Sequence, residues 1–354
     1  MMRTVLFLSS LLLIAVACVP SVACTSFVMD GPEGPIFGTN LDLFIPGDGL
    51  ILVNLRGVHK ATYQTGTTGE RHNWRSEYGS VTFNLAGNEF AWGGMNEAGL
   101  VVSSMELRAG EYPEPDERPA FFDGNWTQYV LDMCATVDEA AASLTNLAVR
   151  DGNYTSHYLV ADADGDAIAV EFLDGEQVVH SGEAMRVKAM ANIRYERGLY
   201  AHEHGGRKWW WSNPGQSSER VSACQRRAEA FDAARDTSAV DYAFGTLLYY
   251  VAAPNTRWSI VFDVPSRVIH YRTDQSPIHK SISFENLDFT CGAGKRMLDV
   301  NTRHEGPVDG RFVPYVPAVN QNVFQTFCER YGINVSDEDA RDLMGFYDAF
   351  TCTP

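Results

Sequence analysis

The sequence predicts an α+β protein whose sheets are mainly antiparallel. Short β-rich segments recur along the chain, and tight turns join most of them, which is the pattern of β-hairpins. A smaller number of segments repeat apolar residues at helical spacing. The 354 residues are 45% hydrophobic and 12% aromatic, enough to bury a sizeable core. Hairpins with amphipathic helices packed against them are typical of this fold class.

The first 23 residues have the pattern of a secretory signal peptide. Arg3 precedes an apolar run from Val5 to Val16 that is too short for a membrane-spanning helix. Small side chains stand one and three residues ahead of a cut after Ala23. The prediction is an exported protein, secreted or periplasmic, whose mature chain begins at Cys24.

Cleavage at this point would give Cys24 a free α-amine beside its thiol. Such an amine has a pKa of about 7.7–8.0, so it can accept the thiol proton near neutral pH. The thiolate is the nucleophilic form, and one residue would then supply both nucleophile and base. Two other interpretations exist: a structural cysteine after an export signal, or a lipoprotein in which Cys24 or Cys18 is acylated.

The mature chain is expected to open with a β-hairpin. Thr25–Met29 forms a strand, Gly31–Pro35 a turn, and residues 36–44 the returning strand. The return brings Asn40 and Asp42 close to the N-terminus. A carboxylate can orient a terminal ammonium, so Asp42 is the candidate partner of the N-terminal amine. The alternative is a solvated loop aspartate.

The remaining elements follow from apolar patterning and turn signals. Thr136 and Glu139 form a capping box, which divides residues 126–149 into two helices. Further strands are expected at 51–55, 79–84, 89–92, 101–105, 157–161, 167–172, 177–180, 187–193, 257–263, 268–273 and 281–284, and further helices at 217–231, 241–251, 323–331 and 337–350. Prolines punctuate the chain after residue 296. We therefore divide the mature chain into one domain, 24–295, and a C-terminal extension, 296–354, packed on it.

Three polar residues are candidates for a site. Asn96 lies in a glycine-rich loop, where its amide either caps the turn or contacts a substrate carbonyl. Asn192 ends a strand, where it either forms a turn or donates to a developing oxyanion. Arg220 is expected in the first turn of a helix, where a cation opposes the helix dipole. This position indicates an electrostatic role or a solvated side chain.

An apolar loop carries three adjacent tryptophans, Trp209, Trp210 and Trp211. Such a cluster indicates a pocket wall, a lid or an interface, although one of the rings could equally belong to the core. We assign the three residues to substrate binding.

The charge and metal-binding patterns limit the range of functions. A formal net charge of −17 argues against nucleic acid and anionic membranes as partners. No Cys-x-x-Cys occurs, His202 and His204 lack a third ligand, and Asp162–Asp166 lacks the later residues of a calcium loop. We expect no metal and no other cofactor, and leave a homo-oligomer open.

The cysteine count predicts a disulfide. The seven cysteines become six after cleavage, and a free Cys24 leaves five, so at least one more is unpaired. Cys328 and Cys352 flank the C-terminal helical segment, and we predict a disulfide between them.

The order of the motifs over residues 24–291 resembles the choloylglycine hydrolase family. The matching segments are Cys24-Thr-Ser-Phe27, Gly38-x-Asn-x-Asp42, Gly94-Met-Asn-Glu-x-Gly-Leu100, Asn192, Ser218-x-Arg220 and Thr256-x-Trp-Ser-Ile-Val-Phe-Asp263. The family includes bile salt hydrolases and penicillin V acylases. The resemblance implies an N-terminal-nucleophile fold with four αββα layers and two antiparallel sheets.

The resemblance also implies roles for the candidate residues. Cys24 would be nucleophile and base, Asp42 would orient its amine, and Asn192 and Asn96 would bind the oxyanion. Arg220 would support the site electrostatically. Thr39, which we assign to substrate binding, departs from the family pattern because the family usually has Arg or Lys at this position.

The function implied is an exported hydrolase of linear, non-peptide amides that acts through an acyl-thioester enzyme. Its partner would be a small-molecule amide, such as a bile salt, penicillin V or an acyl-homoserine lactone. One alternative is a non-catalytic exported or lipid-anchored binding protein, which the uncharged Thr39 favours. The other is an acyltransferase.

Overall fold

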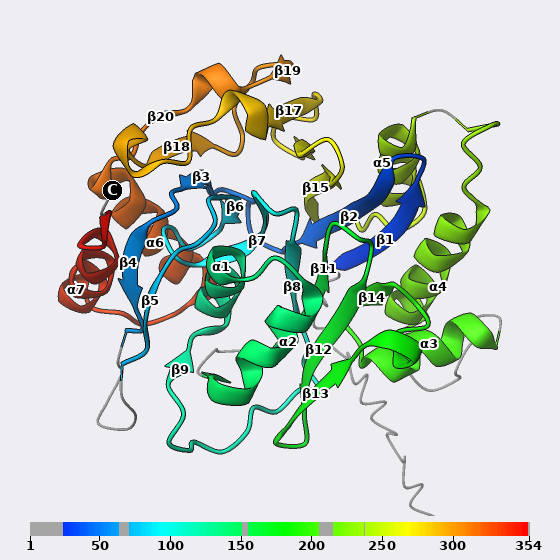
Figure 1. The fold of residues 1–354 in the computed structure, drawn as a ribbon, viewed down its shortest axis with the longest axis horizontal. Helices are drawn as coiled ribbons and strands as arrows, with labels where there is room; N and C mark the ends of the chain where they lie inside the picture. The colour runs from blue at the N-terminus through cyan, green and yellow to red at the C-terminus, as the bar shows by residue number, and fades with distance from the viewer. Residues whose placement is uncertain (1–23, 64–70, 151–154, 205–214, 237, 353–354) are drawn as a thin grey trace, which may run out of the picture.

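The computed structural model describes residues 24–63, 71–150, 155–204, 215–236 and 238–352. Two large sheets stack face to face, with helices on both outer faces, as Figure 1 shows. The predicted α+β class and its αββα layers are confirmed. The predicted signal peptide, residues 1–23, and the predicted substrate-binding residues Trp209, Trp210 and Trp211 lie outside the described residues.

The first sheet carries the N-terminal hairpin as its second and third strands. Over the described residues it has seven strands, and the neighbours pair antiparallel except for the last two. Their order is β14 (Ala189–Ala191), β1 (Thr25–Gly31), β2 (Gly34–Asp42), β15 (Thr256–Asp263), β16 (Val268–Thr273), β17 (Lys280–Ser283) and β19 (Gly306–Pro307). Because both faces of β1 are covered, its residues Thr25 to Met29 are all buried.

The second sheet has nine strands among the described residues, and all its pairs are antiparallel. Their order is β13 (Glu176–His180), β12 (Ala167–Leu173), β11 (Ser156–Ala161), β8 (Val101–Glu106), β7 (Ala91–Asn96), β6 (Ser80–Asn84), β3 (Leu50–Asn54), β18 (Arg296–Asp299) and β20 (Val313–Pro314). Two short strands, β9 (Ala120–Phe121) and β10 (Ala148–Val149), form a separate parallel pair.

Helices cover the outer faces of both sheets. The second sheet is covered by α1 (Asp123–Met133) and α2 (Val137–Asn146), and the first by α3 (Tyr195–Glu203), α4 (Gly215–Ala230) and α5 (Ala239–Tyr249). The predicted capping box is confirmed, because the Thr136 side chain accepts from Glu139 N and the Glu139 side chain accepts from the Thr136 backbone.

The main core lies between the two sheets. Phe83 of the second sheet packs against Trp258 and Tyr271 of the first, with ring centroids 6.1 and 5.5 Å apart. Inward-facing side chains of β1 belong to this core, whereas Phe27 and Met29 face the outer helices. Alternating side chains along each strand therefore serve different layers.

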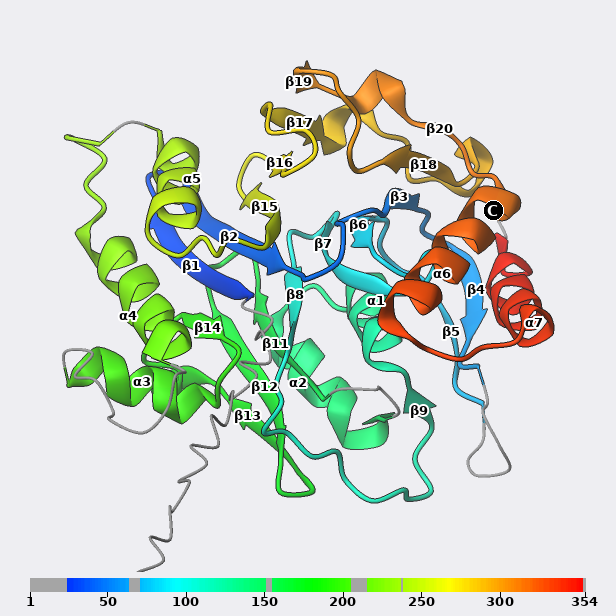
Figure 2. The same cartoon turned by 180° about the vertical axis from the view of Figure 1, so that it is seen from behind.

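The segment after residue 295 is part of the architecture of the domain. Its strand β18 pairs with β3, and thereby extends the second sheet. Figure 2 shows α6 (Pro317–Tyr331) and α7 (Asp337–Asp348) at the end of the molecule that also holds a small sheet. That sheet consists of β21 (Thr351–Cys352), β4 (Val58–Ala61) and β5 (Asn73–Arg75).

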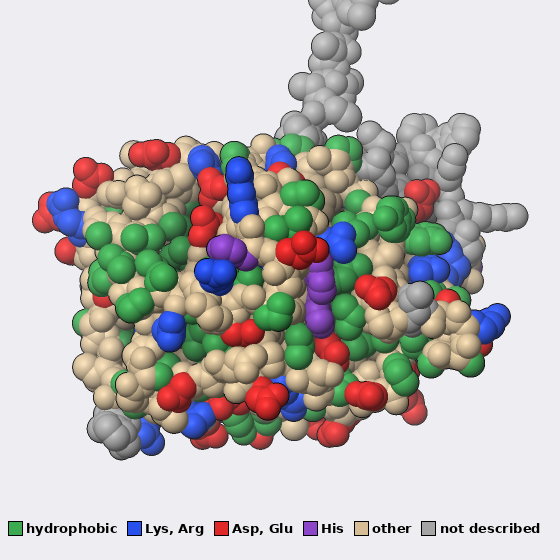
Figure 3. All heavy atoms as spheres, turned by 90° about the horizontal axis from the view of Figure 1, so that it is seen from above, with side chains coloured by type: hydrophobic (Ala, Val, Ile, Leu, Met, Phe, Trp, Pro, Cys, Tyr) green, Lys and Arg blue, Asp and Glu red, His purple; other side chains and the backbone are tan. Residues whose placement is uncertain are grey.

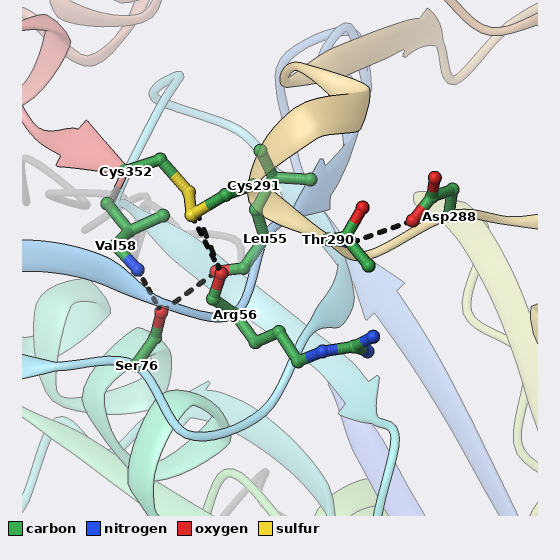
Figure 4. Close-up of a disulfide and its surroundings, with 8 residues drawn as sticks. All are labelled: Leu55, Arg56, Val58, Ser76, Asp288, Thr290, Cys291 and Cys352. Carbon is green, nitrogen blue, oxygen red and sulfur yellow. Dashed lines mark hydrogen bonds between the residues drawn. A yellow bond between two sulfur atoms is a disulfide. The ribbon is translucent and has the colours of Figure 1, made fainter. Parts of the chain in front are cut away.

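A disulfide joins Cys291 to Cys352 and ties the tail to the domain (Figure 4). The predicted pair Cys328–Cys352 is therefore wrong. Cys328 is a free, buried thiol in the apolar cluster of α6 and α7, where it packs with Phe324 and Met344. The chain then forms α7, which packs in the same cluster, and places Cys352 in β21 beside β4.

The surface is mixed in character. Figure 3 looks down on the molecule from above the view of Figure 1, and acidic side chains there are interspersed with basic and apolar ones. No helix within the described parts of the chain has the length and apolarity required to cross a membrane.

Candidate active site

Cys24 directly precedes the inner strand β1 and is 2% exposed. Its Sγ accepts a hydrogen bond from the backbone N of Asp42 at 3.5 Å. Burial, followed by the negative charge of Asp42, raises the pKa of the Cys24 thiol well above its usual range. In the uncut chain the thiol is therefore neutral, and it needs a nearby base to become a nucleophile.

Asp42 ends β2 beside this thiol. Its Oδ1 accepts a hydrogen bond from Thr256 Oγ1 at 2.5 Å, whereas its buried Oδ2 has no partner among the described residues. Burial raises the pKa of Asp42 to about 7, against the opposing effects of the Thr256 hydrogen bond and the charges of Arg220 and Arg257. A buried oxygen of this kind requires a hydrogen-bond donor.

Arg220 reaches the same place from α4. Its Nε donates to Thr25 Oγ1 at 2.7 Å, and its Nη2 donates to the Cys24 carbonyl oxygen at 3.4 Å and to Ser217 Oγ at 3.0 Å. Because α4 begins at Gly215, Arg220 lies beyond the first turn where it was expected. The guanidinium holds the backbone of Cys24 and brings a buried positive charge to the site.

Asn192 lies on the other side of Cys24. Ala191 pairs with Thr25, so the next residue along β14 is beside Cys24 in register. The Asn192 Nδ2 donates to the Glu106 carbonyl oxygen at 2.8 Å, which uses one of its two hydrogens. The second hydrogen is a suitable donor for an oxyanion formed at Cys24.

The structure does not bring Asn96 to this site, so the expected oxyanion role is corrected. Its Nδ2 donates to the carbonyl oxygens of Leu131 and Cys134 at 3.0 and 2.7 Å, and its Oδ1 accepts from Leu100 N at 2.9 Å. The side chain thus joins the β7–β8 turn to the end of α1. The turn-capping alternative describes it correctly.

The expected substrate-binding role of Thr39 is also corrected. Thr39 is fully buried, and its Oγ1 lies 2.8 Å from Ser26 Oγ and 3.0 Å from Ser103 Oγ. These three hydroxyls form a cluster between the two sheets, on the same face of β1 as Cys24. The hydroxyl of Thr39 is therefore occupied by protein partners and does not face a ligand.

Sequence reasoning missed two residues at the site. Thr256 donates a hydrogen bond to Asp42. The negative charge of Glu106 raises the pKa of the Cys24 thiol, and the Glu106 carbonyl oxygen accepts a hydrogen bond from Asn192. Thr256 does stand in a motif that the sequence singles out, but no spacing rule shows which neighbouring strand its hydroxyl reaches. Glu106 ends a strand and gives no sequence signal of a function.

The candidate metal ligands are used in other ways. His202 pairs with Glu229 at 3.3 Å, and the ring of His204 stacks on Tyr200. Asp162 closes the β11–β12 turn, accepting from the backbone N of Asp166 at 3.1 Å. In the parts of the chain that the structure describes, no three His, Cys, Asp or Glu side chains gather in a way that could hold a metal ion.

The fold consists of two stacked sheets between helical layers, and Cys24 directly precedes the inner strand β1. Residues 24–196 match the profile of the linear amide C–N hydrolases, choloylglycine hydrolase family. This is the family that the motifs of the sequence resemble.

Named relatives agree with this assignment. The chain is 31% identical over 198 residues to a penicillin V acylase of Pectobacterium atrosepticum, a stretch that covers 50% of this chain and 52% of that protein. The match thus spans about half the length of this relative.

Solved structures share the fold. A penicillin V acylase of Agrobacterium tumefaciens superposes with a TM-score of 0.68 at 23% identity, covering 83% of this chain and 98% of that one. A variant of the conjugated bile acid hydrolase of Clostridium perfringens gives 0.62 at 12% identity, covering 80% and 98%.

Proposed function

We propose that the protein is an exported amidase in which Cys24, freed as the N-terminal residue, cleaves linear carboxamides. The observation that carries the proposal is the contact of the Cys24 thiol with the backbone of Asp42, whose buried carboxylate has an oxygen, Oδ2, that lacks a donor among the described residues. Cleavage after Ala23 would give Cys24 an ammonium, which we propose as the donor to this oxygen. A buried carboxylate then stabilises the charge that proton transfer from the thiol produces.

The proposed reaction proceeds through an acyl enzyme. The α-amine of Cys24 takes the thiol proton, and the thiolate attacks the amide carbonyl carbon. The oxyanion accepts a hydrogen bond from Asn192 Nδ2. Collapse breaks the C–N bond, and the α-ammonium gives its proton to the leaving amine. Water, deprotonated by the same α-amine, then attacks the thioester and releases the acid.

The named relatives support a substrate class. Penicillin V and conjugated bile acids each contain a linear amide bond to an apolar acyl part, and acyl-homoserine lactones contain the same kind of bond. The predicted binding loop with Trp209, Trp210 and Trp211 suits an apolar acyl group. A small-molecule amide of this kind is the proposed substrate.

Export is supported by the cysteines as well as by the signal-peptide pattern. The Cys291–Cys352 disulfide is of a type that persists in oxidising compartments. We therefore place the mature protein in the periplasm or outside the cell.

The test begins with the intact mass and N-terminal sequence of the natively processed protein. A chain that starts with an unmodified Cys24 is expected, followed by hydrolysis of at least one of the three amide types. The Cys24→Ala variant should lose all detectable turnover because it lacks the nucleophile. Cys224→Ala, which removes another buried free thiol, should retain it.

Three results would contradict the proposal. Full amidase activity in Cys24→Ala would exclude the mechanism. An acylated Cys24, or a cut at another residue, would remove the base and favour the non-catalytic binding protein. Transfer of the acyl group to an added amine, with no free acid formed, would instead identify an acyltransferase.

A further inference from the structure

Thr256 holds one oxygen of the Asp42 carboxylate in a fixed direction. The Thr256 Oγ1 accepts a hydrogen bond from Ala253 N at 2.9 Å and lies 2.5 Å from Asp42 Oδ1. A hydroxyl has a single hydrogen, and the Ala253 N–H points at its oxygen, so that hydrogen is directed to Asp42. The carboxylate is thereby fixed through Oδ1, and Oδ2 is left without a partner among the described residues.

A β-bulge makes this contact possible. β2 and β15 are neighbours (Figure 1), and their register shifts between Thr256 and Trp258. Ser259 hydrogen-bonds to Asn40 at 2.7 Å, and Thr256 hydrogen-bonds to Asp42. The two donors are thus three residues apart on β15, whereas their partners are two residues apart on β2. In a regular strand, residues three apart face opposite sides. The bulge adds the residue that turns Thr256 to the face of Asp42.

We infer that Thr256 is a positioning residue for Asp42, whose Oδ2 it leaves free for the α-ammonium of Cys24. This inference rests on the proposed function. Both arginines near Asp42 have other partners. Arg220 binds Cys24 and its neighbours, and Arg257 donates to the Leu43 and Ile45 carbonyl oxygens. Among the described residues, the Thr256 hydroxyl is the direct donor to this carboxylate.

The charged groups around Asp42 give the sign of the pH effect. Cys24 faces it from β1, Arg220 from α4 and Arg257 from β15. Burial raises the pKa of Asp42, and the Thr256 hydrogen bond opposes that rise because it favours the ionised form. Loss of the hydroxyl should therefore raise this pKa further, and the carboxylate would take up its proton at a higher pH.

The experiment compares Thr256→Val, which has nearly the same shape and no hydroxyl, with Thr256→Ser, which keeps the hydroxyl. Ser259→Ala is the matched control, since it removes a buried hydroxyl from the same strand that bonds to Asn40. Thr256→Ala replaces the valine variant if that protein does not fold. Two readouts are used: kcat and KM against pH on a cleaved amide, and the pH dependence of Cys24 alkylation by iodoacetamide, located by peptide mass.

Thr256→Val should lower kcat about 10- to 100-fold, the range for a hydrogen bond to a charged group, and change KM little. The acid limbs of both profiles should move up by about one pH unit, while Thr256→Ser and Ser259→Ala keep the wild-type limbs. A wild-type limb in Thr256→Val would overturn the positioning role. Absence of amide cleavage by the wild type would reject the proposed function instead, and the alkylation profiles would still decide the role of Thr256.

Discussion

At the scale of single residues, the site combines two groups whose charged forms are disfavoured by burial. The pKa of Cys24 and that of Asp42 are both raised by removal from water, and the negative charge of Asp42 raises the pKa of Cys24 further. A positive α-ammonium next to both would reverse this balance. Signal-peptide cleavage would thus do more than release the chain, because it would add the charge that makes a thiolate and a carboxylate compatible.

Asn96 and Asn192, for which the sequence predicts the same oxyanion role, should respond differently to substitution. Asn192→Ala is expected to lower kcat by about 100- to 1000-fold, as the loss of an oxyanion donor typically does, with little change in stability. Asn96→Ala should lower the free energy of unfolding by about 3 kcal/mol, because its three buried backbone partners each lose a bond.

The measurements are steady-state kinetics and urea unfolding of both variants. A stable Asn96→Ala with a kcat loss as large as that of Asn192→Ala would restore Asn96 to the oxyanion site. An unchanged kcat in Asn192→Ala would remove Asn192 from it.

At the scale of elements, three adjacent strands share a buried polar cluster. Glu171 on β12 lies 3.3 Å from His157 Nδ1 on β11 and 3.2 Å from His180 Nε2 on β13, and accepts from Tyr195 N at 2.9 Å. Burial alone would raise the pKa of Glu171, but the bonds to the two histidines lower it to about 2. The ionised carboxylate therefore stabilises the pairing of these strands.

The direction of this shift sets a pH window. The folded-state pKa of about 2 lies below the ordinary 4.5, so the stabilisation is complete above pH 4.5 and is lost as the pH falls toward 2. Glu171→Gln should cost about 3 kcal/mol at pH 7 and progressively less below pH 4.5. Urea unfolding at pH 7, 5, 4 and 3 measures this, with the exposed Glu176→Gln as control. A cost that does not vary with pH would assign the effect to packing.

Most elements could be predicted from the sequence because their signals are local. Turn residues, caps or apolar spacing within a few residues predict the hairpin of β1 and β2, the break between helices at Thr136, and helix α4. Helix α3 was missed because Tyr195–Glu203 is short, contains a glycine at position 198 and has no side-chain cap at its start. Cys24 and Asp42 were brought together correctly because one hairpin joins them.

The incorrect site predictions depended on contacts that no local pattern encodes. The amide of Asn96 is occupied by the end of α1, and Thr39 is occupied by Ser103 from the other sheet. The contact of Thr256 with Asp42 depends on a bulge in a strand more than two hundred residues later in the chain. The residue types indicated the chemistry of the site, whereas tertiary packing determines which of these side chains are free to take part in it.

At the scale of the whole molecule, the disulfide closes a loop of 61 residues that contains α6 and α7. Both sulfur atoms lie near the Arg56 carbonyl oxygen, at 3.5 and 3.6 Å, beside β4. Cys352→Ser should lower the free energy of unfolding by about 2–4 kcal/mol, because the reduced chain gains freedom when unfolded.

Urea unfolding with and without a reductant measures this cost, and non-reducing peptide mapping should recover Cys291 linked to Cys352. Cys328→Ala is the control, since it leaves the linkage in place and should remain sensitive to the reductant. Recovery of a peptide that links Cys328 to Cys352 would contradict the assignment.

The pairing of β18 with β3 also bears on how the chain folds. These partners come from opposite ends of the mature sequence, and β15, from the later part of the chain, lies beside β2. Neither sheet can therefore be completed until nearly all of the polypeptide has been synthesised, and such distant pairings are slow to form because a long loop must close first. Until then the apolar strand β3 lacks one of its neighbours, so correct assembly depends on the strands that are synthesised last. A prematurely terminated chain should therefore aggregate instead of accumulating as a smaller folded protein.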